Sequence, residues 1–305
     1  MNQAQEFYDK NSSKETYHDI ALREQSDIIK IRSFNNFIKS MLIDEYARKI
    51  KDDSISVLDL CCGKGGDIYK YDFAKNVKKV YFIDISPKSI DVVRERLARV
   101  HNFESFLRDG CMTSDYISEF DIENSISLVS CQFALHYCFD SKERASKAIS
   151  NISKALVKDG YFICTIPNSY EIVRRLNAVE PELEIKNEFY SITFDKEVVE
   201  KKFPSFGSKY YFKLNEAVDC PEFLIHPKVL KDLCKEYNLE CECDNVDFFD
   251  YFNSHIHTDI QKYLQTIRRM NPFHEKFANR RKIGILTKSE MQVIGLYSIM
   301  VFKKA

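Results

Sequence analysis

The residues best suited to chemistry lie between positions 57 and 67, in the stretch VLDLCCGKGGD. Its apolar beginning is typical of a buried strand, and Gly63, Gly65 and Gly66 follow at once. Glycine lets a chain turn sharply after a strand and brings bare backbone against a ligand. Asp67 is expected to open a helix, whose first backbone N–H groups can face an anion. The stretch therefore predicts a ligand-binding turn between a strand and a helix.

A second carboxylate follows the next predicted strand, residues 79–83. Asp84 lies 21 residues beyond Gly63 (84 − 63), a spacing at which an acidic residue binds the ribose hydroxyls of a nucleoside cofactor. A tight turn without a ligand is the alternative interpretation. The arrival of Asp84 at this distance favours the cofactor site.

The order of the glycines distinguishes between cofactors. Dinucleotide sites use G-x-G-x-x-G, whereas this loop reads D-x-x-x-G-x-G from Asp59 to Gly65. That order resembles the first motif of the S-adenosylmethionine-dependent methyltransferases, with Cys61 in place of a usual glycine. A nicotinamide-dependent dehydrogenase is therefore disfavoured.

Composition excludes several other classes. The 305 residues are 44% hydrophobic and 30% charged, which is typical of a globular α/β protein of one large or two small domains. A net charge of −1 gives no general nucleic-acid signal, so RNA binding needs a local basic face. Ten cysteines without a CxxC pair or a secretory leader indicate reduced thiols and no metal site. No apolar stretch is long enough to cross a membrane.

The elements that position the loop alternate between strands and helices. We expect helices at 31–46, 87–100, 141–157 and from 169, and strands near 57–60, 79–83, 105–108, 126–132 and 161–166. This alternation predicts a doubly wound, mainly parallel sheet of the α/β class. Residues 180–225 interrupt it with short strands at 189–194 and 209–214, and are expected to form an insertion over the cofactor face.

The remaining segments flank this core. A helix at 227–237, a strand at 240–249, a polar helix at 250–270 and a closing strand at 296–302 are predicted after the insertion. Thr287 and Glu290 form a capping box for one more helix. Residues 1–25 are polar and are expected to be a mobile arm, with residues 26–305 forming the folded domain.

Some candidate residues have an ordinary structural alternative. Asp109 follows a strand and could meet an adenine amino group, or only precede the turn at Gly110. The aromatic segment 133–137 lies where α/β sheets bind ligands, but could be core packing. Asn35 and Asn36 could be a solvated helix face, and Glu222 a solvated residue on an edge strand.

Local motifs from residue 31 onward are similar to those of the eukaryotic mRNA cap (guanine-N7) methyltransferases. They are FNNFIKS at 34–40, VLDLCCGKGGD at 57–67, QFALHY at 132–137, GYFICTIPNSYEIVRRL at 160–176, CPEFLI at 220–225 and LTKSEMQVIGLY at 286–297. The resemblance implies a Rossmann-like class I methyltransferase with a seven-stranded sheet and an inserted β-rich subdomain. It implies transfer of a methyl group from S-adenosylmethionine to guanine N7 of the 5′ GpppN cap, with S-adenosylhomocysteine as the product.

The resemblance also implies roles for individual residues. The implied cofactor-binding residues are Lys39, Cys61, Gly63, Asp67, Asp84, Asp109, Gln132 and Tyr137. The implied cap-binding residues are Asn35, Asn36, Lys64, Lys70, Arg96, Phe133, His136, Pro167, Glu222 and Tyr297. Guanine N7 offers a lone pair and has no proton to lose, so no acid–base catalyst is expected. His136, Tyr297 and Glu222 would act by positioning the base, and no metal is expected.

The implied partners are the capped RNA, and beyond it the other capping enzymes and the tail of RNA polymerase II. A nuclear monomer without membrane attachment is expected. Two alternatives stay open. A small-molecule methyltransferase would share the cofactor residues but has no use for Asn35, Asn36 and Glu222. A non-catalytic cap-binding subunit could dispense with Asp84, which is present here.

Overall fold

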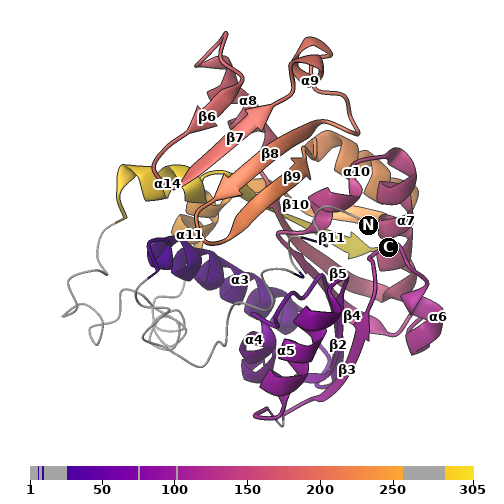
Figure 1. Cartoon of the computed structure of the whole chain (residues 1–305). Coiled ribbons are helices and arrows are strands. Elements are labelled where there is room, and N and C mark those ends of the chain that lie inside the picture. Colours follow the sequence, from indigo (N-terminus) through magenta and orange to yellow (C-terminus); the bar gives the residue numbers. More distant parts are fainter. Residues whose placement is uncertain (1–5, 7–8, 10–25, 75, 101, 257–285) are drawn as a thin grey trace.

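A computed structural model describes residues 6, 9, 26–74, 76–100, 102–256 and 286–305 (Figure 1). Its main sheet has seven strands. Their spatial order is β10 (Leu239–Asp247), β11 (Tyr297–Lys304), β5 (Leu156–Pro167), β4 (Ile126–Gln132), β1 (Ile55–Leu60), β2 (Val77–Asp84) and β3 (Glu104–Asp109). The pairs from β5 to β3 are parallel, whereas β11 is antiparallel to both β5 and β10. The predicted seven-stranded, mainly parallel sheet is confirmed.

Helices cover both faces of this sheet (Figure 1). One face carries α3 (Ile29–Lys49), α4 (Ile68–Phe73), α5 (Pro87–Leu97), α11 (Phe248–Ile256) and α14 (Lys288–Ile294); the other carries α6 (Tyr116–Phe120), α7 (Lys142–Ala155) and α10 (Pro227–Glu236). Successive side chains of β1 alternate between the two cores, with Val57 in one and Leu58 in the other. Strands that are apolar on both faces therefore produce the doubly wound arrangement.

Predicted start signals hold at two helices. At α5, the Ser86 hydroxyl accepts the backbone N–H of Ser89, and Pro87 is the first helical residue. At α14, Thr287 and Glu290 form the complete reciprocal capping box. Helix α5 begins at the end of the sheet where the glycine loop lies, and α14 leads the chain back to that end, where Tyr297 pairs with Pro167.

The expected insertion forms a second sheet. Its four antiparallel strands are β6 (Glu184–Lys186), β7 (Tyr190–Phe194), β8 (Lys209–Leu214) and β9 (Val218–Phe223), with α9 (Lys196–Glu200) between β7 and β8. The helix α8 (Ser169–Asn177) leads into it from the end of β5. Side chains along β8 alternate strictly between exposed and buried, so one face of the inserted sheet packs inward.

Several boundaries differ from the prediction. Strand β5 begins at Leu156 rather than at 161, because residues Asp159–Gly160, which suggested a turn, lie inside the strand with Asp159 at φ +63°. Strand β10 ends at Asp247 and α11 begins at Phe248, two residues earlier than expected. The short helices α6 and η1 (Leu135–Cys138) were not predicted.

Two predicted segments fall mainly outside the described ranges. These are the rest of the polar helix expected at 250–270 beyond residue 256, and the arm at 1–25 apart from Glu6 and Asp9. Among the helices of the described ranges, none combines the length and the apolar content needed to cross a bilayer.

Candidate functional site

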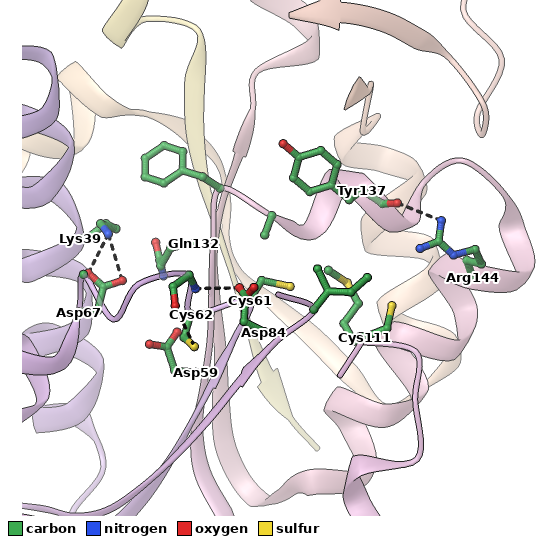
Figure 2. Close-up of a pocket in the computed structure, with 16 residues that line it drawn as sticks. Lys39, Asp59, Cys61, Cys62, Asp67, Asp84, Cys111, Gln132, Tyr137 and Arg144 are labelled. Atoms are coloured by element: carbon green, nitrogen blue, oxygen red, sulfur yellow. Dashed lines mark hydrogen bonds and ion pairs between the residues drawn. The ribbon is translucent and has the colours of Figure 1, made fainter. Parts of the chain in front are cut away.

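A cavity of about 260 Å³ opens where β1, β2 and β4 end (Figure 2). Every predicted cofactor residue except Asp109 lines it: Lys39, Cys61, Gly63, Asp67, Asp84, Gln132 and Tyr137. Asp109 is exposed at the end of β3, in register with Asp84 on β2. Its near neighbours Cys111 and Met112 line the cavity instead. The parallel topology thus gathers residues that are distant in the sequence at one edge of the sheet.

The Asp84 carboxylate is fixed at the mouth of the glycine loop. Its Oδ2 accepts the backbone N–H of Gly63 at 2.8 Å, and its Oδ1 accepts that of Ser86 at 2.9 Å. Burial raises the pKa of Asp84, and these two N–H groups oppose the rise. The Ser86 hydroxyl also donates to Asp9 at 2.6 Å, which brings a second carboxylate close by. Each Asp84 oxygen has a lone pair left to accept a ligand hydroxyl.

The loop holds Cys61 in a backbone conformation that favours glycine. Cys61 has φ +58°, in the left-handed region, which explains why a glycine is usual there. The pKa of Cys61 is raised well above its usual value by its contact with the Cys131 thiol and by burial, so the thiol is neutral. Gly63, at φ +52°, faces open space, since a Cβ there would meet no atom within 4 Å. The loop therefore keeps bare backbone on the cavity side.

Three charged side chains meet beside the loop. Lys39 Nζ and Lys70 Nζ each lie 2.7 Å from Asp67 Oδ1. Although burial alone would raise it, the two lysines hold the pKa of Asp67 well below its usual range. Burial lowers the pKa of Lys70 to about 8, against the attraction of Asp67. The Lys70 Nζ also donates to Asn36 Oδ1 at 3.3 Å and to the backbone oxygen of Gly66 at 2.9 Å.

This geometry bears on the predicted phosphate-binding cations. Lys70 is only 5% exposed and satisfies Asp67, so it lies inside the protein rather than at an open surface. Lys64 and Arg96 are half-buried, on the loop and on α5. Any contact between these three cations and a triphosphate stays a prediction.

A smaller cleft separates the inserted sheet from the ends of β5 and β11. It encloses about 10 Å³, room for about one water. It is lined by Pro167, Ile172, Ile192, Tyr210, Phe212, Glu222, Leu296 and Tyr297, three of which are predicted cap residues (Pro167, Glu222, Tyr297). Because β11 is antiparallel to β5, the first residue of β11, Tyr297, pairs with the last of β5, Pro167.

The two spaces adjoin through Phe133. This residue lines the larger cavity, and its ring lies 4.9 Å from the Tyr297 ring at an interplanar angle of 87°. Such edge-to-face contact fixes both rings at the boundary. A ligand in the cavity and a ligand in the cleft would therefore be neighbours.

Glu222 is buried at the boundary, being only 4% exposed. The hydroxyl of Tyr210 donates to its Oε2 at 2.6 Å, and that of Tyr137 donates to Oε1 at 3.3 Å. His136 Nε2 also lies 3.3 Å from Oε1. The interpretation of Glu222 as a solvated edge residue is therefore wrong.

Sequence reasoning missed Tyr210. Burial and the neighbouring Glu222 raise the pKa of Tyr210 well above its usual value, so its hydroxyl stays protonated and donates. The available signal was its position on the buried face of β8, but the β8–β9 register that sets Tyr210 opposite Glu222 could not be read from the sequence.

Some buried polar atoms are left for a ligand. Within the described part of the chain, Asn35 Oδ1, Gln132 Oε1 and His136 Nδ1 are buried without a hydrogen-bond partner. Such atoms are rare in folded proteins because they cost free energy, and a ligand with N–H groups can satisfy them. Gln132 lines the cavity, where it could accept an ammonium group. Together with the acidic Asp84, Gln132 Oε1 fits S-adenosylmethionine.

The sheet order, the glycine loop and the acid on β2 define a class I S-adenosylmethionine-dependent methyltransferase. Two solved structures share this fold. One is an S-adenosylmethionine-dependent methyltransferase from Clostridium acetobutylicum, with a TM-score of 0.52, 13% identity and coverage of 98% of this chain and 99% of that one. The other, the PH0226 protein from Pyrococcus horikoshii, has a TM-score of 0.50, 14% identity and coverage of 92% and 94%. At these identities the likeness concerns the fold alone.

The chain belongs to the mRNA (guanine-N(7))-methyltransferase family, whose domain model matches residues 2–305. An mRNA cap guanine-N(7) methyltransferase from Drosophila melanogaster is 35% identical over 315 residues, covering 92% of this chain and 73% of its own length. The corresponding protein from Schizosaccharomyces pombe is 36% identical, covering 92% and 77%. The family, activity and cofactor predicted from the motifs are confirmed, and the dehydrogenase and small-molecule alternatives are set aside.

Proposed function

We propose that the two adjoining spaces bind the two substrates of cap methylation, one in each space. The larger cavity binds S-adenosylmethionine. The small cleft, which has room for about one water as it stands, widens to bind the guanine of the cap. The observation that supports this division is the contact of Phe133 with Tyr297, 4.9 Å between ring centroids, at the boundary of the two spaces. Methyl transfer takes place across that boundary.

On the cofactor side, the chain supplies fixed acceptors and donors. Asp84 accepts the ribose hydroxyls, since its carboxylate is held by Gly63 and Ser86. Asp109 meets the adenine amino group, while Lys39 and Gln132 hold the amino-acid end of the molecule. The bound cofactor supplies a methyl group on a positively charged sulfur.

On the guanine side, Glu222 is the central acceptor. Guanine presents adjacent N1–H and N2–H₂ donors, which a carboxylate can accept together. Since N7 has a free lone pair, the residues need only hold the base in line with the methyl group. Orientation of this kind can lower a barrier by roughly 7–11 kcal/mol.

The same residues favour the product-like charge. Positive charge reaches the guanine ring during the step, and the buried Glu222 carboxylate attracts it. The faces of Tyr297 and Phe133 are suited to a cationic ring. The chain thus stabilises the transition state more than the neutral substrate.

The rest of the cap lies toward α3 and α5. Lys64, Lys70 and Arg96 neutralise the triphosphate, with Lys70 exchanging part of its contact with Asp67. Asn35 and Asn36 hold the cap from α3. The insertion at about 180–225 closes over the cap site.

The test is incubation of the protein with labelled S-adenosylmethionine and GpppG-capped RNA, with uncapped RNA and GTP as controls. Label should appear on N7 of the cap guanine only. We also propose that the enzyme acts in the nucleus as a monomer beside the other capping enzymes and the RNA polymerase II tail. Sedimentation and pull-down with the phosphorylated tail peptide test that part separately.

A further inference from the structure

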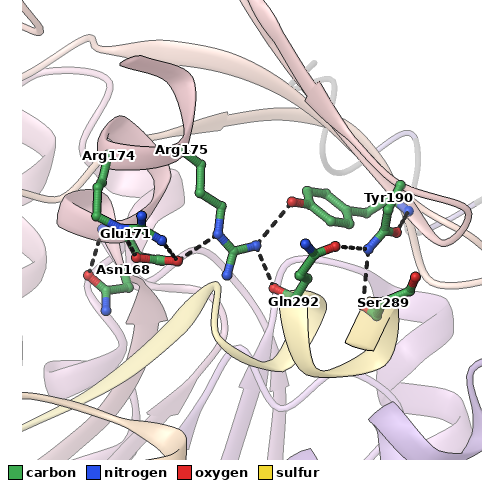
Figure 3. A network of polar contacts seen from close by, with 8 residues as sticks. Asn168, Glu171, Arg174, Arg175, Tyr190, Ser289 and Gln292 are labelled. Atoms are coloured by element: carbon green, nitrogen blue, oxygen red, sulfur yellow. Dashed lines mark hydrogen bonds and ion pairs between the residues drawn. The ribbon is translucent and has the colours of Figure 1, made fainter. Parts of the chain in front are cut away.

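Arg175 on α8 connects three elements that are distant in the sequence (Figure 3). Its Nε donates to Glu171 Oε1 at 2.7 Å. Its Nη1 donates to the Tyr190 hydroxyl on β7 at 3.1 Å and to the backbone oxygen of Gln292 on α14 at 2.7 Å. A guanidinium is planar and carries five N–H donors, so it can hold several acceptors in one fixed arrangement. The Arg175 side chain is mostly buried, with 16% exposed.

Two of these elements also form walls of the small cleft. On α8, Ile172 lies one helical turn before Arg175 and lines the cleft. On β7, Ile192 lies two residues beyond Tyr190, and both side chains are buried on the same face of the strand. Movement of the Arg175 contacts would therefore reach both walls directly.

The third contact, from Arg175 to the Gln292 carbonyl, anchors the junction of α14 with β11, which is formed by Gly295 and Leu296. The Gln292 carbonyl lies in the last turn of α14, where backbone oxygens lack partners within the helix. Gly295 packs against the guanidinium, since a Cβ there would lie 3.1 Å from Arg175 Nη2. Leu296 and Tyr297, both cleft residues, follow immediately.

We infer that Arg175 is a positioning residue for the guanine cleft: it sets the separation between the inserted sheet and the junction of α14 with β11. This inference rests on the proposed placement of the cap guanine between Glu222 and Tyr297. The cleft encloses only about 10 Å³, so its walls must separate to admit a planar base, and their resting separation affects how easily the base enters.

A second tie keeps the inserted sheet in place without Arg175. The Asn187 Nδ2 donates to the backbone oxygen of Ser289 and to Gln292 Oε1, both at 3.0 Å. Removal of the guanidinium should therefore shift the junction rather than detach the sheet. Arg174 provides the matched control, because it also donates to Glu171 but its side chain is 69% exposed.

The experiment compares Arg175→Ala, Arg175→Lys and Arg174→Ala by KM for GpppG-capped RNA, calorimetric affinity for S-adenosylmethionine, and thermal unfolding. We expect Arg175→Ala to raise KM at least about tenfold while cofactor affinity stays within about twofold. Arg175→Lys should be intermediate because an ammonium cannot reproduce the planar arrangement, and Arg174→Ala should match the wild type.

An unchanged or lowered KM in a folded Arg175→Ala protein would overturn the inference, as would equal losses of cap and cofactor binding. If Arg175→Ala does not fold, Tyr190→Phe removes one acceptor only, and a wild-type KM there overturns the inference too. Glu222→Gln is measured alongside. Wild-type kinetics for Glu222→Gln would refute the cleft assignment, whereas a defect there with none at Arg175 refutes only the positioning role.

Discussion

Tyr210 and Glu222 face each other across the β8–β9 pair, and the tyrosine hydroxyl donates to Glu222 Oε2 at 2.6 Å. The contacts to Oε1, from Tyr137 and His136, are both longer at 3.3 Å. One carboxylate oxygen is therefore held firmly by the protein, while the other can exchange its contacts for a ligand donor. A buried acid arranged in this way suits recognition of the guanine edge.

Glu222→Gln keeps the shape of the side chain but removes its charge and turns one acceptor into a donor. We expect kcat/KM for capped RNA to fall at least about tenfold, equivalent to about 1.4 kcal/mol, because transition-state stabilisation is lost. Cofactor affinity should be intact. Discrimination against an inosine cap, which lacks the N2 amino group, should weaken. Methylation of GpppG-capped RNA at the wild-type rate would show that Glu222 does not contact guanine.

Asp84→Ala removes the acceptor that we assign to the ribose hydroxyls. Calorimetry should show a loss of S-adenosylmethionine affinity, and methyl transfer should be abolished. Because Asp84 is buried and accepts two backbone N–H groups, Asp84→Asn should be measured in parallel, since it keeps the shape and one acceptor. Unchanged affinity in a folded Asp84→Ala protein would refute the assignment.

Arg96→Glu tests the triphosphate site. The change should raise KM for capped RNA and reduce its dependence on salt, because one phosphate contact is lost. Cofactor affinity should barely change. Charge reversal at Lys70 is a poor test, since a carboxylate there would face the buried Asp67. Equal loss of both ligands would indicate a folding defect instead.

Cys61→Gly should retain cofactor binding and relieve backbone strain at φ +58°. The left-handed conformation costs an L-residue roughly 1 kcal/mol, so thermal stability should be equal or higher. Cys61→Val, whose branched side chain tolerates this φ poorly, should weaken S-adenosylmethionine binding about tenfold or unfold the loop. Equal affinities for the glycine and valine variants would mean that the loop geometry does not matter.

Glu45 links α3 to α11 and makes folding depend on pH. Burial alone would raise its pKa, but hydrogen bonds from His255 and Tyr251, with Lys49, lower it to about 2. Because the pKa is lowered on folding, the stabilisation is present above pH 4.5 and is lost as pH falls toward 2.

Thermal unfolding of Glu45→Gln should therefore show a deficit at pH 7, on the order of 2–3 kcal/mol, that shrinks toward pH 2. Asp44→Asn, which removes a surface pair with Arg48, is the control and should change little. A deficit of constant size at all pH values would mean that the glutamate charge is not the cause.

The features predicted correctly from the sequence are those formed by residues near one another in the chain or at a known spacing. The glycine loop, Asp84 and the capping box of α14 involve residues close together in the chain or at a familiar spacing, so their geometry could be predicted. Tyr210 and Arg175 act through partners set by strand register and by packing of the insertion against α14, which the sequence does not encode locally. The φ of Cys61 was also hidden, because a cysteine gives no sign of a left-handed turn.

Strand β11 lies between β5 and β10, although both neighbours precede it in the chain. During synthesis, β5 and β10 are complete before β11 emerges. Until then, the edge of each strand that will pair with β11 has unpaired backbone N–H and C=O groups. Open edges of this kind can pair with other chains and aggregate. When β11 pairs with both strands, its first residue, Tyr297, reaches the cleft at the same time. Pairing of β11 thus covers one edge each of β5 and β10 and completes the proposed guanine site in a single folding step.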